Sequence, residues 1–266
     1  MKDLFRNKHL ANILNNGYTV VNNVIAKNEC IKLKKIGKKI YKDYGKKIKI
    51  KNPLEETIYN LHNKNKKFLK YINFKKTFPI VKKALSIGGY KNNCDIIIRQ
   101  VAMRNPKKGH AQQLHNDTRI IGCRYPLVIH VIYMLDDFTK DNGATRLVPK
   151  SHRKNSYPLN NKVYQNEKKI YGKQGDALLF DASLWHGSSK KIKEQDRWGM
   201  IFSYSRWFLK PDFDFNKNTP DKIFKKLNKN QKTLLGFKSN PMKDEFTRAS
   251  SLSNKFEKPS KYKLPN

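Results

Sequence analysis

The segment QQLHNDTR, residues 112–119, contains His115 and Asp117 separated by one residue. Because side chains alternate between the two faces of a β-strand, two residues with this spacing point to the same side and can bind one ion. A His-x-Asp pair is short enough to arise by chance in a chain with 7 His. It therefore indicates a metal site only if a third ligand and a suitable scaffold accompany it. Alone, it describes a polar loop equally well.

His186 is the third candidate ligand, and it follows the apolar run ALLF within GDALLFDASLWHGSS, residues 175–189. Two imidazoles and one carboxylate that leave three coordination positions open form the facial triad of non-haem Fe(II) oxygenases. Zinc could use the same residues, but it usually completes a four-coordinate shell and needs only one open position. The structural alternative for His186 is a core histidine beside Trp185. We predict the metal site.

Arg197 lies eleven residues after His186, at the start of the next apolar run. A guanidinium forms paired hydrogen bonds with a carboxylate, so we expect Arg197 to bind the distal carboxylate of a dicarboxylic co-substrate. Ser188 would add a hydroxyl donor to the same carboxylate. The structural alternative is an ion pair of Arg197 with Asp196 or Glu194.

Two further residues are predicted to line a substrate pocket. His130 in VIHVIYML shares a strand face with apolar neighbours, and a buried polar group needs a hydrogen-bond partner. That partner could be a core group or the substrate, and we assign His130 to the substrate. Gln113 would face the same side as His115 in a regular strand, so it is a second substrate candidate. His110 is expected to be solvated.

Arginine is concentrated in the part of the chain that contains these residues. Eight of the ten arginines lie between Arg99 and Arg206, whereas lysine carries the positive charge elsewhere. The guanidinium is planar and permanently charged, which suits it to binding anions. We take Arg206 as a substrate candidate. Four more arginines could equally well contact the substrate or form structural salt bridges, namely Arg99, Arg104, Arg119 and Arg124.

The segment 17–92 predicts a strand followed by helices that must support the site. A short strand is expected at 18–21. Apolar residues at helical spacing predict a helix after it with Asn28 as its N-cap; these residues are Ile31, Leu33, Ile36 and Ile40. A later helix is expected to start near Pro79 and to end at Gly88 and Gly89.

The segment 93–210 contains short β-branched or aromatic runs separated by turn residues, which predicts an antiparallel sandwich or barrel. Beyond it, residues 211–266 are rich in Lys and Asn. This extension predicts a helix near 220–227 and a poorly ordered end, and it could act as a lid or a tail. We expect one domain over 1–266.

Composition limits the setting and the partners of the protein. The net charge of +36 suggests nucleic-acid binding, but the lysines are spread along the whole chain, so we attribute the charge to composition. No apolar run of about 18 residues predicts a membrane span, and the first residues lack the apolar stretch of a secretory signal. Three cysteines, an odd number, argue against a disulfide framework. We expect a reducing, cytoplasmic setting.

From about Gly17 to Arg206 the chain resembles the phytanoyl-CoA dioxygenase family of Fe(II)/2-oxoglutarate oxygenases. GYTVVNNVIAKNECIKL is similar to the family's opening strand and helix, and HND to its metal-binding His-x-Asp. LDDFTKDNGATRLVPKSH resembles its loop-and-strand signature, and GDALLFDASLWHGSS with Arg197 resembles its last metal histidine and 2-oxoglutarate anchor. Lys150 departs from the pattern, because the family usually has Gly there.

The resemblance implies a mainly β fold with flanking helices. Its core would be a double-stranded β-helix, a jelly-roll or cupin-like barrel, with N-terminal helices packed on it. It also implies that Fe(II) is bound by His115, Asp117 and His186, and that the C5 carboxylate of 2-oxoglutarate is bound by Arg197 and Ser188. The keto-acid end and O2 would take the open positions on the iron.

The activity that this resemblance implies is hydroxylation of a C–H bond of a small molecule, with 2-oxoglutarate converted to succinate and CO2. The substrate could be anionic. Related halogenases have a small residue where this chain has Asp117, so the carboxylate favours hydroxylation. A nucleic-acid or protein oxygenase that uses the basic surface is the main alternative. Nucleic-acid dealkylases of that kind usually carry a second arginine on the final strand, after the arginine that binds the cofactor. Arg206 lies at the wrong distance from Arg197 for this role. A barrel that only binds a ligand is the non-enzymatic alternative. The sequence specifies neither the primary substrate nor the oligomeric state.

Overall fold

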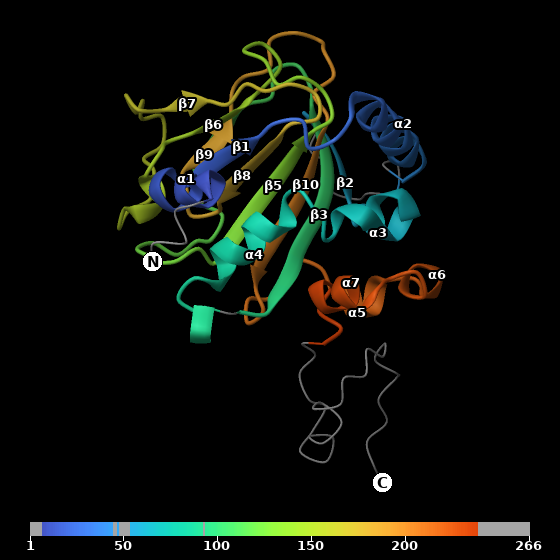
Figure 1. The fold of residues 1–266 in the computed structure, drawn as a ribbon. Coiled ribbons are helices and arrows are strands. Elements are labelled where there is room, and N and C mark those ends of the chain that lie inside the picture. Colours follow the sequence, from blue (N-terminus) through green and yellow to red (C-terminus); the bar gives the residue numbers. More distant parts are fainter. Residues whose placement is uncertain (1–6, 45–46, 48–53, 93, 239–266) are drawn as a thin grey trace.

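Two antiparallel sheets form the centre of the protein (Figure 1). The computed structural model describes residues 7–44, 47, 54–92 and 94–238. The strand order is β1-β8-β5-β10-β3-β2 in the larger sheet and β4-β9-β6-β7 in the smaller one. In chain order the strands are β1 (Tyr18–Val21), β2 (Glu55–Tyr59), β3 (Ile96–Pro106), β4 (Gln112–His115), β5 (Val128–Met134), β6 (Thr145–Leu147), β7 (Lys168–Lys169), β8 (Ala177–Asp181), β9 (His186–Ser188) and β10 (Gly199–Arg206).

Helices cover the face of the larger sheet that points away from the smaller sheet (Figure 1). They come both from the N-terminal half of the chain and from the segment after β10. The α-helices are α1 (Lys8–Asn16), α2 (Lys27–Tyr44), α3 (Leu61–Lys64), α4 (Phe78–Ser86), α5 (Phe215–Asn218), α6 (Asp221–Phe224) and α7 (Lys229–Leu234). The 3-10 helices are η3 (Lys66–Tyr71), η4 (Tyr90–Asn92) and η5 (Ser151–Arg153).

The alternation of side chains along β5 separates the core from the pocket. Val131 and Tyr133 belong to the large hydrophobic cluster under the helices. His130 and Ile132 point to the opposite face and line a pocket between the sheets. The central strand of the larger sheet therefore contributes to the hydrophobic core with one face and to a polar site with the other.

The predicted first strand is confirmed, because β1 spans Tyr18–Val21. The helix that follows was predicted in the right place, and Leu33, Ile36 and Ile40 face the core as predicted, but its cap and Ile31 were wrong. It begins at Lys27, so Asn28 lies inside it, and Ile31 is 55% exposed. The buried face follows Cys30, Leu33, Gly37 and Ile40. Ile31 was included because it is apolar, although its position lies on the solvent side of the helix.

The mainly β jelly roll with flanking helices is confirmed, but the sheets do not close into a barrel. In the described part of the chain no strand pairs with strands of both sheets. Neither α1 nor β2 was predicted from the sequence. Helix α6 falls within the helix predicted at 220–227, whereas the poorly ordered end predicted for the chain lies outside the described residues. None of the described helices is long and apolar enough to span a bilayer.

The turn before β8 fastens this strand to the start of α2. Gly175 has φ +96°, and its carbonyl oxygen accepts hydrogen bonds from Val24 N at 2.8 Å and Ile25 N at 3.0 Å. A Cβ atom at Gly175 would overlap the carbonyl oxygen of Ile25. The position therefore needs glycine both for its dihedral angle and for space.

We expect Gly175→Ala to lower the free energy of unfolding by about 3 kcal/mol or more, because left-handed strain and backbone overlap add. Gly109→Ala is the matched control. Gly109 has φ +87°, and a Cβ there meets no atom within 4 Å, so only the strain of about 1 to 2 kcal/mol applies. Urea unfolding followed by tryptophan fluorescence measures both. Equal losses in the two variants would contradict the overlap.

Candidate metal centre and co-substrate pocket

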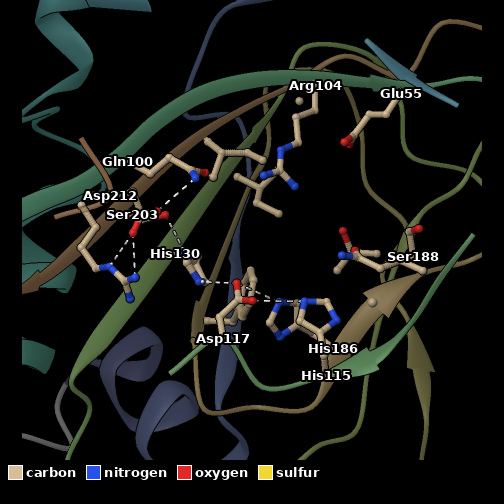
Figure 2. A pocket seen from close by; sticks show the side chains of 18 of the residues that line it. Glu55, Gln100, Arg104, His115, Asp117, His130, His186, Ser188, Ser203 and Asp212 are labelled. Carbon is tan, nitrogen blue, oxygen red and sulfur yellow. Dashed lines mark hydrogen bonds and ion pairs between the residues drawn. The ribbon is translucent and has the colours of Figure 1, made fainter. Parts of the chain in front are cut away.

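A pocket of about 580 Å³ lies between the two sheets (Figure 2). Its lining comes from strands of both sheets and from the segments that follow β4 and β10. The predicted ligands His115, Asp117 and His186 all line it, together with Arg197 and Ser188. The structure thus brings together five residues that are separated by up to 82 positions in the sequence.

The two histidines are directly opposite each other on adjacent strands. His115 of β4 is the Cα partner of His186 of β9, and their ring centroids are 4.3 Å apart. Asp117 follows β4 and is held by a hydrogen bond from its backbone N to Ala182 O at 3.0 Å. Its carboxylate lies 3.2 Å from His115 Nε2 and 3.4 Å from His186 Nε2. One donor atom from each residue therefore falls within 4.8 Å of the others.

The hydrogen bonds of the two rings select the atoms that face the carboxylate. His115 Nδ1 lies 2.9 Å from Gln113 O, and His186 Nδ1 lies 2.8 Å from Leu184 O. A carbonyl oxygen only accepts hydrogen bonds, so each Nδ1 carries the proton and each neutral ring has a lone pair at Nε2. Two lone pairs and a carboxylate then converge without a proton between them. This donor set fits a divalent cation.

The protonation equilibria of Asp117 and His186 favour the forms that bind metal, whereas that of His115 favours the protonated form. Burial alone would raise the pKa of the Asp117 carboxyl, but the contacts with His115, His130 and His186 hold it well below its ordinary value. Burial lowers the pKa of His186 despite its contact with Asp117. For His115 burial is the largest single influence and lowers the pKa, but the carboxylate of Asp117 and the carbonyl of Gln113 together outweigh it, so the pKa is raised.

Arg197 is a buried cation without an ion-pair partner among the described residues. It is 8% exposed, its guanidinium lies 3.9 Å above the Phe138 ring, and its NH2 group donates to Thr145 Oγ1 at 3.2 Å. Its Nε has no hydrogen-bond partner in the described structure. Burial lowers its pKa to about 10. A buried charge of this kind is costly unless an anion compensates it. Asp196, the alternative partner, instead pairs with Lys38.

Ser188 and Thr145 place this cation beside the metal centre. Ser188 is two residues beyond His186 on β9 and is the Cα partner of Thr145 on β6. Two residues along a strand correspond to about 7 Å, a gap that a five-carbon dicarboxylate can bridge. Ser188 Oγ lies 3.3 Å from His110 Nδ1. His110 was expected to be solvated, but it is half-buried and lines the pocket, and burial lowers its pKa.

Two of the predicted substrate residues lie elsewhere. Gln113 does not line the pocket, whereas Gln112 does. The pairing of β4 with β9 shows why: Gln112 pairs with Ser188 and His115 with His186, so β4 contains one extra residue. This β-bulge reverses the alternation that the prediction assumed.

Arg206 has a structural role in the fold. Its guanidinium donates to Pro126 O at 3.0 Å and to Ile87 O at 2.6 Å, and it does not line the pocket. His130 does line the pocket, and both of its ring nitrogens contact protein groups. Of the three residues assigned to the substrate, only His130 therefore lines the pocket; of the four arginines left open, Arg99, Arg104 and Arg119 line it as well.

Several other residues that face the pocket were not assigned to it from the sequence. Glu55 and Arg104, whose charges act on Arg197, lie at one end, and Gln100 and Asp212 lie at the other end (Figure 2). The clustering of arginines was the only signal for any of them. Glu55 and Asp212 gave no signal, because each lies far in sequence from the motifs.

The family model for phytanoyl-CoA dioxygenase (PhyH) matches residues 13–198. The chain belongs to the phytanoyl-CoA dioxygenase family. It is 29% identical over 145 residues to dioxygenase cdmA of Talaromyces verruculosus, with 48% of this chain and 46% of that protein covered. It is 26% identical over 125 residues to the uncharacterized protein Rv1501 of Mycobacterium tuberculosis, with 47% and 46% covered. The chain spans about half the length of the curated relatives that it matches.

Solved structures give the same fold for this phytanoyl-CoA dioxygenase family member. HygX from Streptomyces hygroscopicus with nickel and 2-oxoglutarate bound superposes with a TM-score of 0.65 at 17% identity, covering 77% of this chain and 88% of HygX. HygX with nickel, 2-oxoglutarate and hygromycin B bound gives 0.61 at 15% identity, with the same shares covered. The family is one of Fe(II)/2-oxoglutarate oxygenases. At that level the prediction of iron and 2-oxoglutarate as cofactors, with O2 as oxidant, is confirmed.

We expect metal-free protein to bind Co²⁺. Asp117→Ala should lower that affinity by about a hundredfold or more, because even residues that only hydrogen-bond to metal ligands contribute about 10- to 100-fold. Asp43→Ala is the control, because Asp43 is an exposed carboxylate on α2. Isothermal titration measures both affinities. Equal affinities in Asp117→Ala and wild type would contradict the metal centre.

The affinity for Co²⁺ should also fall as the pH is lowered from about 8 to about 6, because metal and protons compete for the imidazole nitrogens. The raised pKa of His115 means that this residue takes up a proton at a higher pH than an ordinary histidine. The loss of affinity should therefore begin on the alkaline side of the usual histidine range. A pH-independent affinity would contradict histidine ligation.

Proposed function

We propose that the protein is an Fe(II)- and 2-oxoglutarate-dependent dioxygenase that hydroxylates a C–H bond of a small molecule. One observation supports the proposal. The three converging acceptor atoms lie next to Ser188, two residues beyond His186, and its strand partner Thr145 accepts a hydrogen bond from the buried guanidinium of Arg197. That guanidinium has no carboxylate partner in the described structure. A cation completes the first group and an anion completes the second. A metal-bound dicarboxylate satisfies both at once.

Each residue has a separate task in this reaction. His115, Asp117 and His186 would hold the iron. Arg197 would bind the distal carboxylate of 2-oxoglutarate, with Ser188 as a second donor. Bound iron, with 2-oxoglutarate and O2, supplies the oxidant for the C–H bond, and 2-oxoglutarate leaves as succinate and CO2. The burial of Arg197 against Phe138 excludes water from the anchor, which strengthens its attraction for a carboxylate.

The charges of the pocket support a polar substrate, anionic ones included. Four cations and three carboxylates line it, namely Arg99, Arg104, Arg119, Arg197, Glu55, Asp117 and Asp212. Fe²⁺ and a 2-oxoglutarate dianion cancel each other, so the loaded pocket keeps one net positive charge if the histidines are neutral. The volume of about 580 Å³ is that of a small-molecule site. HygX was solved with hygromycin B together with nickel and 2-oxoglutarate, which supports the same arrangement here.

We assign the substrate to the end of the pocket opposite Arg197. Asp212 Oδ1 accepts hydrogen bonds from Arg99 Nε at 3.2 Å and NH2 at 2.7 Å, and Asp212 Oδ2 accepts one from Gln100 Nε2 at 3.2 Å. Gln100 pairs with Ser203, whereas the next pair joins Ile98 and Tyr204, so Arg99 is an extra residue in β3. The bulge supports this assignment because it brings two neighbouring polar side chains to the pocket.

We infer hydroxylation rather than halogenation from the carboxylate of Asp117, which occupies the position that a halide would need. For the setting of the protein, the three free cysteines support a reducing compartment, and we propose the cytoplasm.

Anaerobic addition of Fe(II) and 2-oxoglutarate should produce the weak visible charge-transfer band of a chelated keto acid. Arg197→Ala should weaken 2-oxoglutarate binding by about 10- to 100-fold, because it removes a charge-assisted hydrogen-bonding group. Arg124→Ala is the control, since Arg124 is exposed and outside the pocket. Titration of the band measures the affinity. A folded wild-type protein without the band would favour the non-enzymatic alternative, a protein that only binds a ligand.

A screen of small polar and anionic molecules for stimulated succinate formation should identify a substrate. Its product should gain one oxygen atom by mass spectrometry, in chloride buffer as in chloride-free buffer, because Asp117 leaves no position for a halide. A chlorinated product would contradict hydroxylation. Stimulation by RNA or DNA alone would instead support the nucleic-acid oxygenase.

A further inference from the structure

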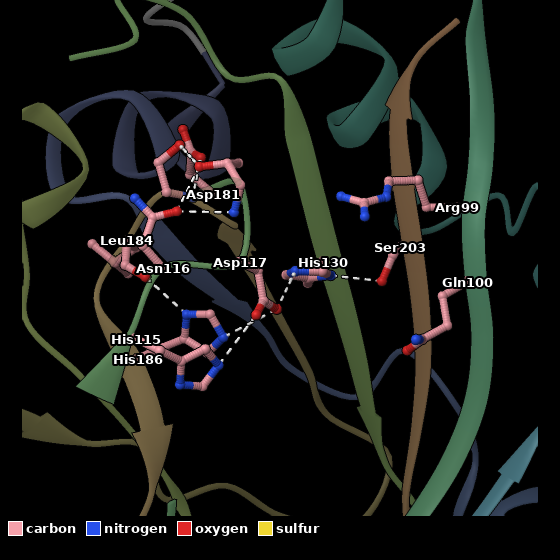
Figure 3. A network of polar contacts seen from close by, with 12 residues as sticks. Arg99, Gln100, His115, Asn116, Asp117, His130, Asp181, Leu184, His186 and Ser203 are labelled. Carbon is pink, nitrogen blue, oxygen red and sulfur yellow. Dashed lines mark hydrogen bonds and ion pairs between the residues drawn. The ribbon is translucent and has the colours of Figure 1, made fainter. Parts of the chain in front are cut away.

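A chain of hydrogen-bonding groups connects the metal centre to the larger sheet (Figure 3). His130 of β5 is the Cα partner of Ser203 of β10. Its Nδ1 lies 2.6 Å from Ser203 Oγ, and its Nε2 lies 3.1 Å from Asp117 Oδ2. Asp117 belongs to the segment after β4 in the smaller sheet. His130 therefore bridges the gap between the two sheets at the carboxylate of the triad.

The chemistry of the three groups allows one arrangement of protons for a neutral ring. An ionised carboxylate only accepts hydrogen bonds, so a neutral His130 ring that donates across this 3.1 Å contact must carry its proton on Nε2, although the two groups are not aligned as a hydrogen bond in the described structure. His130 Nδ1 then has the lone pair and accepts from the Ser203 hydroxyl. This tautomer is opposite to that of His115 and His186, whose protons are on Nδ1.

Packing fixes the ring of His130 in this orientation. The side chain is 12% exposed, and its ring centroid lies 5.1 Å from Phe180 and 6.1 Å from His186. Position and tautomer are thus both set by the protein before any ligand binds. His130 was predicted from the sequence to contact the substrate, but its ring nitrogens lie 2.6 Å from Ser203 Oγ and 3.1 Å from Asp117 Oδ2.

The consequence for Asp117 is that its two oxygens are not equivalent. Oδ2 lies 3.1 Å from His130 Nε2, its proposed donor, and 3.4 Å from His186 Nε2, whereas Oδ1 lies 3.2 Å from His115 Nε2 and has no second histidine beside it among the described residues. A carboxylate whose second oxygen is held in a hydrogen bond is less free to bind a metal through both oxygens. Binding through one oxygen keeps three positions open, which the keto acid and O2 require.

We infer that His130 is a positioning residue: it donates from Nε2 to Asp117 Oδ2, with its tautomer set by Ser203, and so keeps Asp117 a one-oxygen ligand. The inference rests on the proposed function for the identity of the ligands that fill the open positions. The orientation of Asp117 and the tautomer of His130 do not depend on turnover. They can be measured without iron and without a substrate.

The first measurement is the tautomer of His130 in metal-free wild-type protein, by ¹⁵N NMR with the signal assigned through His130→Gln. A proton on Nε2 is expected, and a proton on Nδ1 would overturn the inference. This readout is independent of the proposed function, which is tested by the band of Fe(II) with 2-oxoglutarate. If wild-type protein shows the expected tautomer but no such band, the proposed dioxygenase function is overturned and the role of His130 is not.

The second measurement is the affinity for Co²⁺ and its visible absorption, which reports the coordination number. His130→Leu removes the donor and should lower the affinity about 10- to 100-fold, the usual effect of an outer partner, and change the intensity of the cobalt spectrum. His130→Gln keeps an amide donor and should recover most of the affinity and the wild-type spectrum. Wild-type affinity and spectrum in His130→Leu would overturn the inference.

Ser203→Ala tests the second step of the chain and leaves the imidazole in place. It should lower the Co²⁺ affinity by less than His130→Leu does, because the tautomer is no longer held. Ser205→Ala is the matched control, since Ser205 is equally buried on β10 and its Oγ has no hydrogen-bond partner among the described residues. If His130→Leu fails to fold, the other two variants and the NMR signal still test the role. Equal Co²⁺ affinities in Ser203→Ala, His130→Gln and wild type, together with a proton on His130 Nδ1, would overturn it.

Discussion

The pairing of His115 with His186 across two short strands is the interaction on which the site depends. It brings two imidazole rings to a centroid distance of 4.3 Å, and the carbonyl groups of Gln113 and Leu184 fix the proton of each ring on Nδ1. With Asp117 beside them, the lone pairs have no proton to share. The smaller sheet therefore holds a group of acceptors that repel one another until a cation binds, and its backbone hydrogen bonds must offset that repulsion.

The two ends of the pocket differ in how their charges are compensated. At one end Arg197 is buried against Phe138 and has no ion-pair partner among the described residues, so this end attracts an anion strongly. At the other end Arg99 is neutralised by Asp212, and both side chains are partly exposed. A fixed co-substrate suits the first environment. A variable substrate suits the second, where the charges are already balanced and water screens them.

Much of the site could be predicted because its signals are local. The period of two along a strand related His115 to Asp117 and His186 to Ser188, and the length of one loop placed Arg197. Gln113 could not be placed in this way, because a bulge in β4 changes which face each residue occupies, and a bulge depends on the partner strand. Ile31 was assigned to the buried face of its helix for a similar reason, since exposure depends on what packs against a helix.

The sequence by itself determined the kinds of donor atoms, their order and the mainly β fold, because residue type and spacing carry that information without reference to a partner. Only the tertiary structure decided which polar groups meet. Ser203 is 73 residues from His130 and contacts it through the register of β5 with β10. Register is set by the burial of whole strand faces, so no short stretch of sequence contains it.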